Sequence, residues 1–366
     1  MRTENSRGQN VRVPVPNPPG TCVHRSESCD MRMKMKLRVL FPGLLIVSLT
    51  FLIRIQFIHL LQRFHLGQRS LSGLPPQRVS MTLDDGVHVY HLNLSRFQEE
   101  FPYLQNYLCS ITLAPQTKWK ASKPLIIMAI KSHPESGSRR MALRHTWAQE
   151  WHLDGYQLRP IFLMGHTDVP GHKEMVKSEN EEYGDVLQWD FTEGHHNLSL
   201  KERCFLEWIV QRIPQVAFIF KGDDDEYVSP PALVQYIKTF AYHPRFLHGY
   251  LRPHSKVVRH AKYAVSEYLF PGNVYPTFLS GGGFLYSGPS ARLLHNVSQK
   301  MPVFPLDDVY FGFLALAADL LFRHDERFHV YRLKFEPCQY LKALVVHGMS
   351  PEELVEIWNK VQNVKC

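Results

Sequence analysis

Four short apolar runs in the first two thirds of the chain constrain its fold more than any other feature. Each run is continuous rather than alternating, which is typical of a strand that is covered on both faces. Segments with helical periodicity separate the runs, and strands that alternate with helices predict a parallel α/β sheet. In such sheets ligands bind at the carboxyl ends of the strands. The runs are residues 124–130, 159–165, 185–190 and 215–221, and the helical segments are 138–149, 173–182 and 198–212.

The second half of the chain has less regular elements. A strand is expected over residues 275–288, followed by a helix that has Pro289 near its first turn. Another helix is expected to begin at Asp307 and Asp308. Ser350 is expected to cap a final amphipathic helix.

Three consecutive aspartates, Asp223, Asp224 and Asp225, directly follow the fourth apolar run. Their mutual repulsion costs stability unless a cation binds nearby. In an extended segment alternate side chains point the same way, so Asp223 and Asp225 can face one cation while Asp224 points into the protein. Carboxylate oxygens suit Mn²⁺ or Mg²⁺, which keep positions open for phosphate oxygens. The alternative is an acidic turn on the solvated surface, where runs of acidic residues commonly lie.

Two further motifs contain candidate site residues. Gly281, Gly282 and Gly283 stand inside an expected strand, where glycines are unfavourable unless the backbone closely approaches a ligand or another segment. A β-bulge is the alternative explanation. Asp307 and Asp308 stand where a helix begins, and acidic residues at that position are commonly caps.

Three arginines and one histidine complete the candidates. Arg139, Arg140 and Arg144 lie on the expected helix after the first strand, where they could hold a diphosphate or form a solvated basic face. His347 ends an apolar strand near the C-terminus. Because the aspartate triplet could bind a metal, His347 is either a structural residue or an additional metal ligand.

The N-terminal region carries most of the net charge. Residues 1–38 hold eight Lys/Arg and three acidic residues, so five of the eight net positive charges lie there. The rest of the chain is nearly neutral, which excludes the long basic stripe of a nucleic-acid-binding protein. The uncharged run 39–53, extended to residue 61, is long enough to span a membrane. We expect an uncleaved anchor over 39–61 behind a cytosolic tail, rather than a cleaved signal peptide or a buried helix.

Residues beyond the anchor are expected to face the lumen, with 62–120 as a stem and 121–366 as the main folded domain. The sequons at Asn93, Asn197 and Asn296 agree with this orientation, because all three follow the anchor. Four cysteines also follow it and permit three pairings, between which the sequence does not choose. These cysteines are Cys109, Cys204, Cys338 and Cys366.

Several motifs occur together from about Pro124 to Trp358, in the order AIKSHPESGSRRMALRHTW, EYGDVLQWDFTEGHHNLSLKERCFLEW, FKGDDDEYV, LSGGGFLYS, PLDDVYFG and PCQYLKALVVHGMSPEELVEIW. In this combination the chain resembles the Golgi β-1,3-glycosyltransferases of the β-1,3-galactosyl and β-1,3-N-acetylglucosaminyl type. The resemblance implies a single-pass type II Golgi membrane protein whose luminal catalytic domain is residues 121–366. It also implies an α/β fold, a nucleotide-diphospho-sugar-binding (GT-A-like) sandwich with a mostly parallel central sheet.

The resemblance assigns a metal and donor site to the aspartate triplet. Asp223, Asp224 and Asp225 match the DxD-type motif, which holds Mn²⁺, or alternatively Mg²⁺, and the donor diphosphate. Asp225 is the implied direct ligand of the metal. His347 remains the candidate for an additional ligand.

The resemblance also implies roles around the donor sugar. Asp308 matches the catalytic base, and Gly281–Gly283 match a segment that lines the sugar pocket. Arg140 and Lys201 lie in motifs near the donor nucleotide.

The implied reaction is an inverting, single-displacement transfer in β-1,3 linkage to a terminal galactose or similar sugar of a glycan, on a glycoprotein or glycolipid. The C-terminal segment resembles the N-acetylglucosaminyl branch more than the galactosyl branch, which favours UDP-GlcNAc over UDP-galactose as the donor. From other classes, a catalytically weak carbohydrate-binding module is an alternative. A metal-dependent phosphohydrolase would bring more His and carboxylate ligands than this sequence offers.

The chain departs from the family pattern beside the triplet. Glu226 and Tyr227 follow the aspartates, where members usually have an apolar residue and Phe. Ser229 and Ala148 replace a common Asn and Gly. We expect Glu226 to add negative charge beside the metal site. We also expect the helix N-terminus to keep Asp308 ionised, which would make it an intrinsically weak base.

Overall fold

The structure, a computed structural model, describes residues 80–116, 123–240 and 243–366. No helix in these ranges is long and apolar enough to cross a membrane. The expected cytosolic tail and the anchor over 39–61 lie outside the described residues, so both stay predictions. The described residues all belong to one compact unit.

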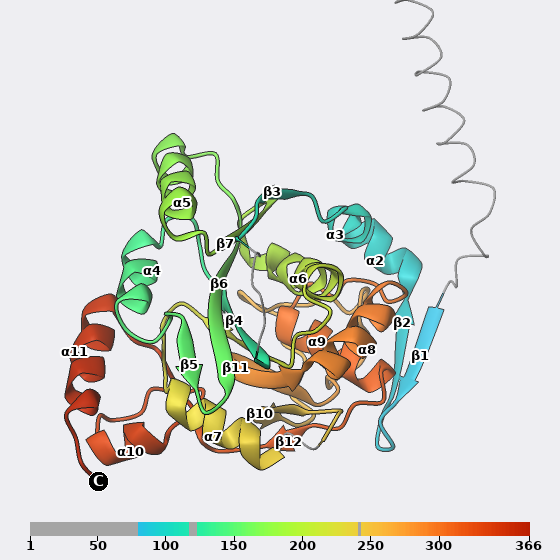
Figure 1. Ribbon diagram of the computed structural model, residues 1–366. Coiled ribbons are helices and arrows are strands. Elements are labelled where there is room, and N and C mark those ends of the chain that lie inside the picture. Colours follow the sequence, from blue (N-terminus) through green and yellow to red (C-terminus); the bar gives the residue numbers. More distant parts are fainter. Residues whose placement is uncertain (1–79, 117–122, 241–242) are drawn as a thin grey trace, which may run out of the picture. The chain divides into compact units, whose positions relative to one another are not determined.

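A nine-stranded mixed sheet forms the centre of this unit (Figure 1). Its order is β12-β10-β11-β8-β4-β6-β7-β3, and β5 pairs with β6. The four strands β8, β4, β6 and β7 are parallel, as the sequence predicted. The sheet as a whole is mixed rather than mostly parallel, because β11, β10, β3 and β5 each add an antiparallel pairing, whereas β12 pairs with β10 in parallel. The strands are β3 Ile111–Leu113, β4 Leu125–Lys131, β5 Trp151–Leu153, β6 Tyr156–His166, β7 Val186–Thr192, β8 Phe218–Asp223, β10 Leu247–Arg252, β11 Phe278–Ser287 and β12 Arg323–His324.

Helices cover both faces of the sheet (Figure 1). Alternate side chains of β4 enter two different cores, since successive residues of a strand point to opposite faces. Leu125 and Ile127 pack in the core that includes residues of α6, α8 and α9, whereas Ile126 and Met128 pack in the core that includes residues of α4, α7 and α11. This double burial explains why the strand is apolar from Leu125 to Ile130. The helices are α4 Gly137–Arg144, α5 Pro170–Tyr183, α6 Leu198–Arg212, α7 Pro230–Phe240, α8 Gly288–Ser298, α9 Asp307–Ala317 and α11 Pro351–Gln362.

Residues 80–116, which the sequence assigned to the stem, belong to the same compact unit. They form the hairpin β1 (Ser80–Asp84) and β2 (Val89–Asn93), the helices α2 (Leu94–Glu100) and α3 (Pro102–Asn106), and the edge strand β3. Phe97 and Leu104 are buried, and a disulfide joins Cys109 to Cys204 on α6. The folded domain therefore begins before the expected boundary at residue 121.

A second, three-stranded sheet brings the C-terminal region against the segment that follows the triplet. Its order is β13-β14-β9, and β14 runs antiparallel to β9. Ser350 and Glu353 form a capping box at the start of α11, which confirms the expected cap. A disulfide joins Cys338 to Cys366. The remaining elements are β9 Glu226–Val228, β13 Phe328–His329, β14 Val345–His347 and α10 Pro337–Lys342.

The strand order places the carboxyl ends of β4 and β8 side by side. β6 and β7 lie on one side of β4, and the chain then returns through α6 to place β8 on the other side. Ligand sites in α/β sheets lie where the strand order reverses in this way. The last residues paired between the two strands are Lys131 and Asp223. The aspartate triplet therefore begins at the switch point of the sheet.

Candidate active site

The aspartate triplet forms the turn between β8 and β9. Asp223, Asp225 and His347 each place one ligand atom within 4.8 Å of the other two. Asp224 has a separate partner, because its carboxylate accepts a hydrogen bond of 2.7 Å from the hydroxyl of Ser132. The triplet therefore has the alternating orientation that the sequence predicted.

His347 reaches the triplet because of the way the two short strands pair. His347 lies opposite Glu226 in the register of β14 and β9. The amides of Gly348 and Met349 donate hydrogen bonds of 3.1 and 2.8 Å to the carbonyl of Asp225. The His347 Nε2 atom consequently lies 3.4 Å from Asp225 Oδ1.

The cluster of Asp223, Asp225 and His347 is suited to a divalent cation. Asp225 Oδ1 is buried and accepts no hydrogen bond, which is unfavourable for a carboxylate oxygen unless a cation binds it. Burial also raises the pKa of Asp225, although the charge of His347 opposes this effect. Two carboxylates and one imidazole would leave positions on the ion open for water or phosphate oxygens. The residues present therefore fit the metal that the sequence predicted.

Lys131, the last residue of β4, connects the triplet to a second acidic pair. Its ammonium lies 3.1 Å from Asp223 and 3.0 Å from Asp307, and its side chain is only 8% exposed. A buried lysine is unfavourable unless carboxylates compensate its charge, and here two of them do so. Burial would lower the pKa of Lys131, but these carboxylates raise it well above its ordinary value. Sequence reasoning missed Lys131, although its position at the end of an apolar run was a usable signal.

Asp307 and Asp308 begin α9 but have different partners. Asp307 pairs with Lys131, whereas Asp308 accepts a hydrogen bond of 2.9 Å from the amide of Gly281. Burial and the adjacent charge of Asp307 raise the pKa of Asp308 to about 7. Burial would also raise the pKa of Asp307, but Lys131 lowers it. The expectation that the helix N-terminus leaves Asp308 a weak base is therefore wrong, because burial and a like charge dominate its surroundings.

The three glycines form a bulge in β11 and also allow a close approach. The register between β10 and β11 shifts at this segment, and Gly283 has a φ of 98°, in the left-handed region that favours glycine. A Cβ atom on Gly281 would lie 2.7 Å from Asp308 Oδ1, and one on Gly283 would lie 2.8 Å from the Val345 side chain. Gly282 lies between them. The glycine segment therefore makes room for the carboxylate of Asp308.

Arg140 and Lys201 lie behind the loop that follows β4. Arg140 is fully buried, and its guanidinium donates to Glu179 and to oxygen atoms of residues 132–134. Lys201 donates a hydrogen bond of 2.9 Å to the carbonyl of Ser132. Because Ser132 in turn contacts Asp224, both cations support the loop beside the triplet. Their predicted role near the donor nucleotide stays a prediction.

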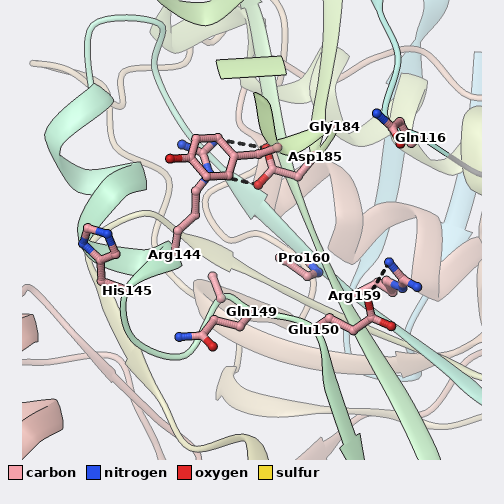
Figure 2. A pocket seen from close by; sticks show the side chains of 11 residues that line it. Gln116, Arg144, His145, Gln149, Glu150, Arg159, Pro160, Gly184 and Asp185 are labelled. Carbon is pink, nitrogen blue, oxygen red and sulfur yellow. Dashed lines mark hydrogen bonds and ion pairs between the residues drawn. The ribbon is translucent and has the colours of Figure 1, made fainter. Parts of the chain in front are cut away.

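The other two arginines of α4 point to different surroundings. Arg139 Nη1 lies 3.7 Å from Asp225 and 3.8 Å from Asp224, so it faces the triplet. Figure 2 shows Arg144 in a hollow of about 660 Å³, where it pairs with Asp185 at 2.9 Å. None of the three aspartates lines that hollow. Arg139 is therefore the arginine of this helix that adds positive charge to the site.

Glu226 does not add the negative charge that the sequence predicted. Its side chain is 0% exposed, and neither of its carboxylate oxygens has a hydrogen-bond partner. Burial and the charge of Asp223 raise its pKa well above the ordinary value. The side chain fills the space beside Gly222, where a Cβ atom would lie 2.1 Å from Glu226 Oε2. The expectation is wrong because Glu226 points into the core, where burial favours its uncharged form.

The three sequon asparagines differ in exposure. Asn296 is exposed on α8, whereas Asn93 and Asn197 are partly buried. Asn93 caps α2 by accepting a hydrogen bond from the amide of Ser95, and Asn197 donates one to the carbonyl of Thr192. Asn296 is therefore the most accessible of the three in the folded domain, and glycosylation at all three stays a prediction.

A solved structure resembles part of this fold weakly. A glycosyltransferase involved in the glycosylation of the major capsid of PBCV-1 aligns with 65% of this chain and 100% of that chain. Its TM-score is 0.35 and its sequence identity is 12%, values too low to carry an argument.

Sequence comparisons with known proteins are far stronger. N-acetyllactosaminide beta-1,3-N-acetylglucosaminyltransferase 2 of Mus musculus is 32% identical over 287 residues, which are 74% of this chain and 71% of the relative. Acetylgalactosaminyl-O-glycosyl-glycoprotein beta-1,3-N-acetylglucosaminyltransferase of Homo sapiens is 35% identical, over 65% of this chain and 66% of the relative. Beta-1,3-galactosyltransferase 5 of Mus musculus is 32% identical, over 69% and 83%. The family model described as Galactosyltransferase matches residues 138–326. The chain therefore belongs to the galactosyltransferase family.

Proposed function

We propose that the chain is an inverting β-1,3-glycosyltransferase that transfers N-acetylglucosamine from UDP-GlcNAc to a terminal galactose or similar sugar of a glycan. One observation carries the proposal. Lys131 connects the metal-ligating cluster, through Asp223, to the acidic pair that contains Asp308. The proposed place for the donor diphosphate and the candidate base therefore belong to one ion-pair network.

The triplet side of this network would bind the donor. Asp223, Asp225 and His347 would hold Mn²⁺ or Mg²⁺, which when bound offsets the charge that develops on the departing diphosphate. Arg139 adds a positive charge on the same side. Ser132 fixes Asp224, so the turn keeps its shape.

The α9 side would act on the acceptor. Asp308 takes the proton of the acceptor hydroxyl while the acceptor oxygen bonds to C1 of the sugar and the bond from C1 to UDP breaks. A pKa of about 7 suits a general base at neutral pH, because the carboxylate is both populated and basic. Attack from the face opposite UDP converts an α-linked donor into a β-linked product. A double displacement would require a free carboxylate nucleophile, and Asp307 is held by Lys131.

The choice of donor rests on resemblance. The C-terminal segment is more similar to the N-acetylglucosaminyl branch, and two of the relatives described above carry N-acetylglucosaminyltransferase names. The second candidate is a β-1,3-galactosyltransferase that uses UDP-galactose. It is favoured by the 32% identity to beta-1,3-galactosyltransferase 5.

We further propose that the protein resides in the Golgi membrane with its catalytic domain in the lumen, where it acts on glycoproteins or glycolipids. The expected anchor over 39–61 and the three sequons support this location. The disulfides Cys109–Cys204 and Cys338–Cys366 support it as well, since disulfides persist in oxidising compartments.

A donor-by-acceptor panel tests the proposal. The full chain is purified in detergent and given UDP-GlcNAc or UDP-galactose, each with galactose-terminated and N-acetylglucosamine-terminated acceptors, with and without Mn²⁺. We expect Mn²⁺-dependent transfer of N-acetylglucosamine to galactose, with a β-1,3 linkage by NMR. Transfer of galactose alone would show that the chain is the second candidate, a β-1,3-galactosyltransferase. Glycan binding without turnover of either donor would show a carbohydrate-binding module instead.

A further inference from the structure

A second group of metal-ligating side chains lies apart from the aspartate triplet. Asp85 and His88 belong to the turn of the β1–β2 hairpin, and His254 belongs to the loop that follows β10. One ligand atom of each residue lies within 4.8 Å of the other two. The fold therefore brings together two segments that are 169 residues apart in the chain.

The carboxylate of Asp85 is fixed and anionic. Its Oδ1 atom accepts hydrogen bonds from the amides of Val87 and His88, at 2.9 and 2.7 Å. Its Oδ2 atom accepts one from the hydroxyl of Tyr90 at 2.7 Å and lies 3.2 Å from His254 Nε2. Burial would raise the pKa of Asp85, but these hydrogen bonds lower it to about 2. A charged oxygen thus faces the imidazole of His254 at any physiological pH.

The two imidazoles lie against each other beside this carboxylate. The ring centroids of His88 and His254 are 4.8 Å apart. His88 Nδ1 is buried and has no hydrogen-bond partner. His254 has a φ of 41°, an uncommon backbone conformation that surrounding contacts must hold in place. A hydrogen bond between Asp85 and His254 explains their distance, but it leaves the buried nitrogen of His88 unexplained.

We propose that Asp85, His88 and His254 bind a Zn²⁺ ion that clamps the hairpin turn to the β10–β11 loop. Two imidazoles and one carboxylate form a donor set that suits Zn²⁺ and not the oxygen-seeking Mg²⁺ or Ca²⁺. In a tetrahedral site with bonds of about 2.0–2.1 Å, ligand atoms are about 3.3 Å apart. The distance of 3.2 Å between Asp85 and His254 already fits. The ligand atom of His88 lies within 4.8 Å of the other two, and a rotation of its ring would have to bring it to the same separation. Water would take the fourth position.

The clamp would act on a loop that leads into the active site. The loop that contains His254 runs on to β11, whose Gly281 donates to Asp308. Within the same loop, the ring of Tyr263 packs edge-on against that of His195 at 5.2 Å. The zinc ion would therefore steady the loop on the α9 side without taking part in chemistry.

Zinc binding by the full chain tests the proposal without any donor or acceptor turnover. Mn²⁺ and UDP are kept in excess to occupy the triplet site, and the zinc affinity is then measured by competition with a chelator. The variants are His88→Gln and His254→Gln, and the control is His91→Gln, which changes an exposed histidine of the same hairpin that bonds Thr82. We expect wild type and His91→Gln to bind one equivalent of zinc. In His88→Gln and His254→Gln the loss of zinc affinity should exceed the ~10–100-fold that removal of an outer-shell partner costs.

Two further measurements, hydrogen exchange and Co²⁺ absorption, report on the zinc site directly. Zn²⁺ should slow hydrogen exchange at residues 84–88 and 253–256 in wild type and in His91→Gln, but not in His88→Gln. Co²⁺ should give the visible absorption of a four-coordinate ion in the same two proteins. If His254→Gln fails to fold, the zinc affinity of His88→Gln decides whether the proposal holds. Equal zinc affinity in all the variants, or zinc lost only with Asp225→Ala, would overturn the proposal.

Discussion

Replacement of Asp308 by Asn tests the proposed mechanism most directly. Asparagine keeps the size of the side chain and can still accept the 2.9 Å hydrogen bond from Gly281, but it cannot take a proton. A positioned general base contributes ~10²–10⁴-fold in rate, or about 3–5 kcal/mol of transition-state stabilisation. We expect kcat to fall by that factor. The affinity for UDP-sugar should change little, because the donor is held on the triplet side.

The pH dependence separates Asp308 from its neighbour. In the wild type, kcat should rise with pH up to about 7 as Asp308 loses its proton, and this rise should vanish in Asp308→Asn. Asp307→Asn is the matched control. It removes a charge that raises the pKa of Asp308, so the rise should move to lower pH, with a much smaller loss of turnover. Lys131 keeps Asp223 as a partner in that variant.

The same pKa determines how this group affects stability. The pKa of Asp308 is about 7 in the folded protein against an ordinary value of 3.8, so between these pH values the folded state holds more protons than the unfolded chain. Its contribution to stability therefore falls as pH rises through this window, by at most about 4 kcal/mol. Asp308→Asn removes that effect and should melt no lower than wild type at pH 8.

Turnover is measured as UDP release under saturating donor, with circular dichroism as the check on folding. Retention of more than about a tenth of the wild-type turnover in Asp308→Asn would refute the role of Asp308 as base. An inactive Asp307→Asn that still folds and binds UDP-sugar would show that the wrong carboxylate was chosen.

Three other changes test the remaining parts of the site. Asp225→Ala should abolish Mn²⁺-dependent UDP binding by calorimetry, and unchanged UDP affinity in this variant would contradict the assignment. His347→Ala should weaken the binding less, because water can replace the imidazole as one of the three ligands. Gly281→Ala should lower kcat toward the level of Asp308→Asn with UDP affinity retained, since its Cβ atom would meet Asp308 Oδ1 at 2.7 Å; a normal kcat would show that Asp308 can move freely. The anchor prediction is checked by N-terminal sequencing of the membrane-extracted protein, and it fails if all membrane-bound chains begin beyond residue 62.

The part of the fold that is buried on both faces could be predicted from the sequence. The runs 124–130 and 215–221 correspond to β4 and β8, because a strand between two cores is apolar over most of the length that the cores cover. The edge strands β3, β5 and β12 were missed, as was β10, which lies between β12 and β11. They are short or only partly buried, so they show neither a continuous apolar run nor a regular alternation. The outer strands of the sheet could therefore not be predicted from the sequence.

Site residues could be predicted where each one marks the end of an element. Asp223 ends β8, His347 ends β14 and Asp308 lies in the first turn of α9, so motif and position agree. Lys131 could not be assigned a role, because its partner Asp307 lies 176 residues away. Arg140 raises the same difficulty. An arginine at a helix start can bind an anionic ligand or a carboxylate of the protein, and here it binds Glu179.

The two adjacent aspartates at the start of α9 show why residue type alone does not define chemistry. Asp307 and Asp308 are adjacent and share one helix start, yet the pKa of one is lowered and that of the other is raised. The difference comes from Lys131, which reaches Asp307 from the end of β4 and leaves Asp308 to a single backbone amide. Two like carboxylates with separated pKa values can take different roles. In this chain one holds the lysine that connects the two halves of the site, which leaves the other available to accept a proton.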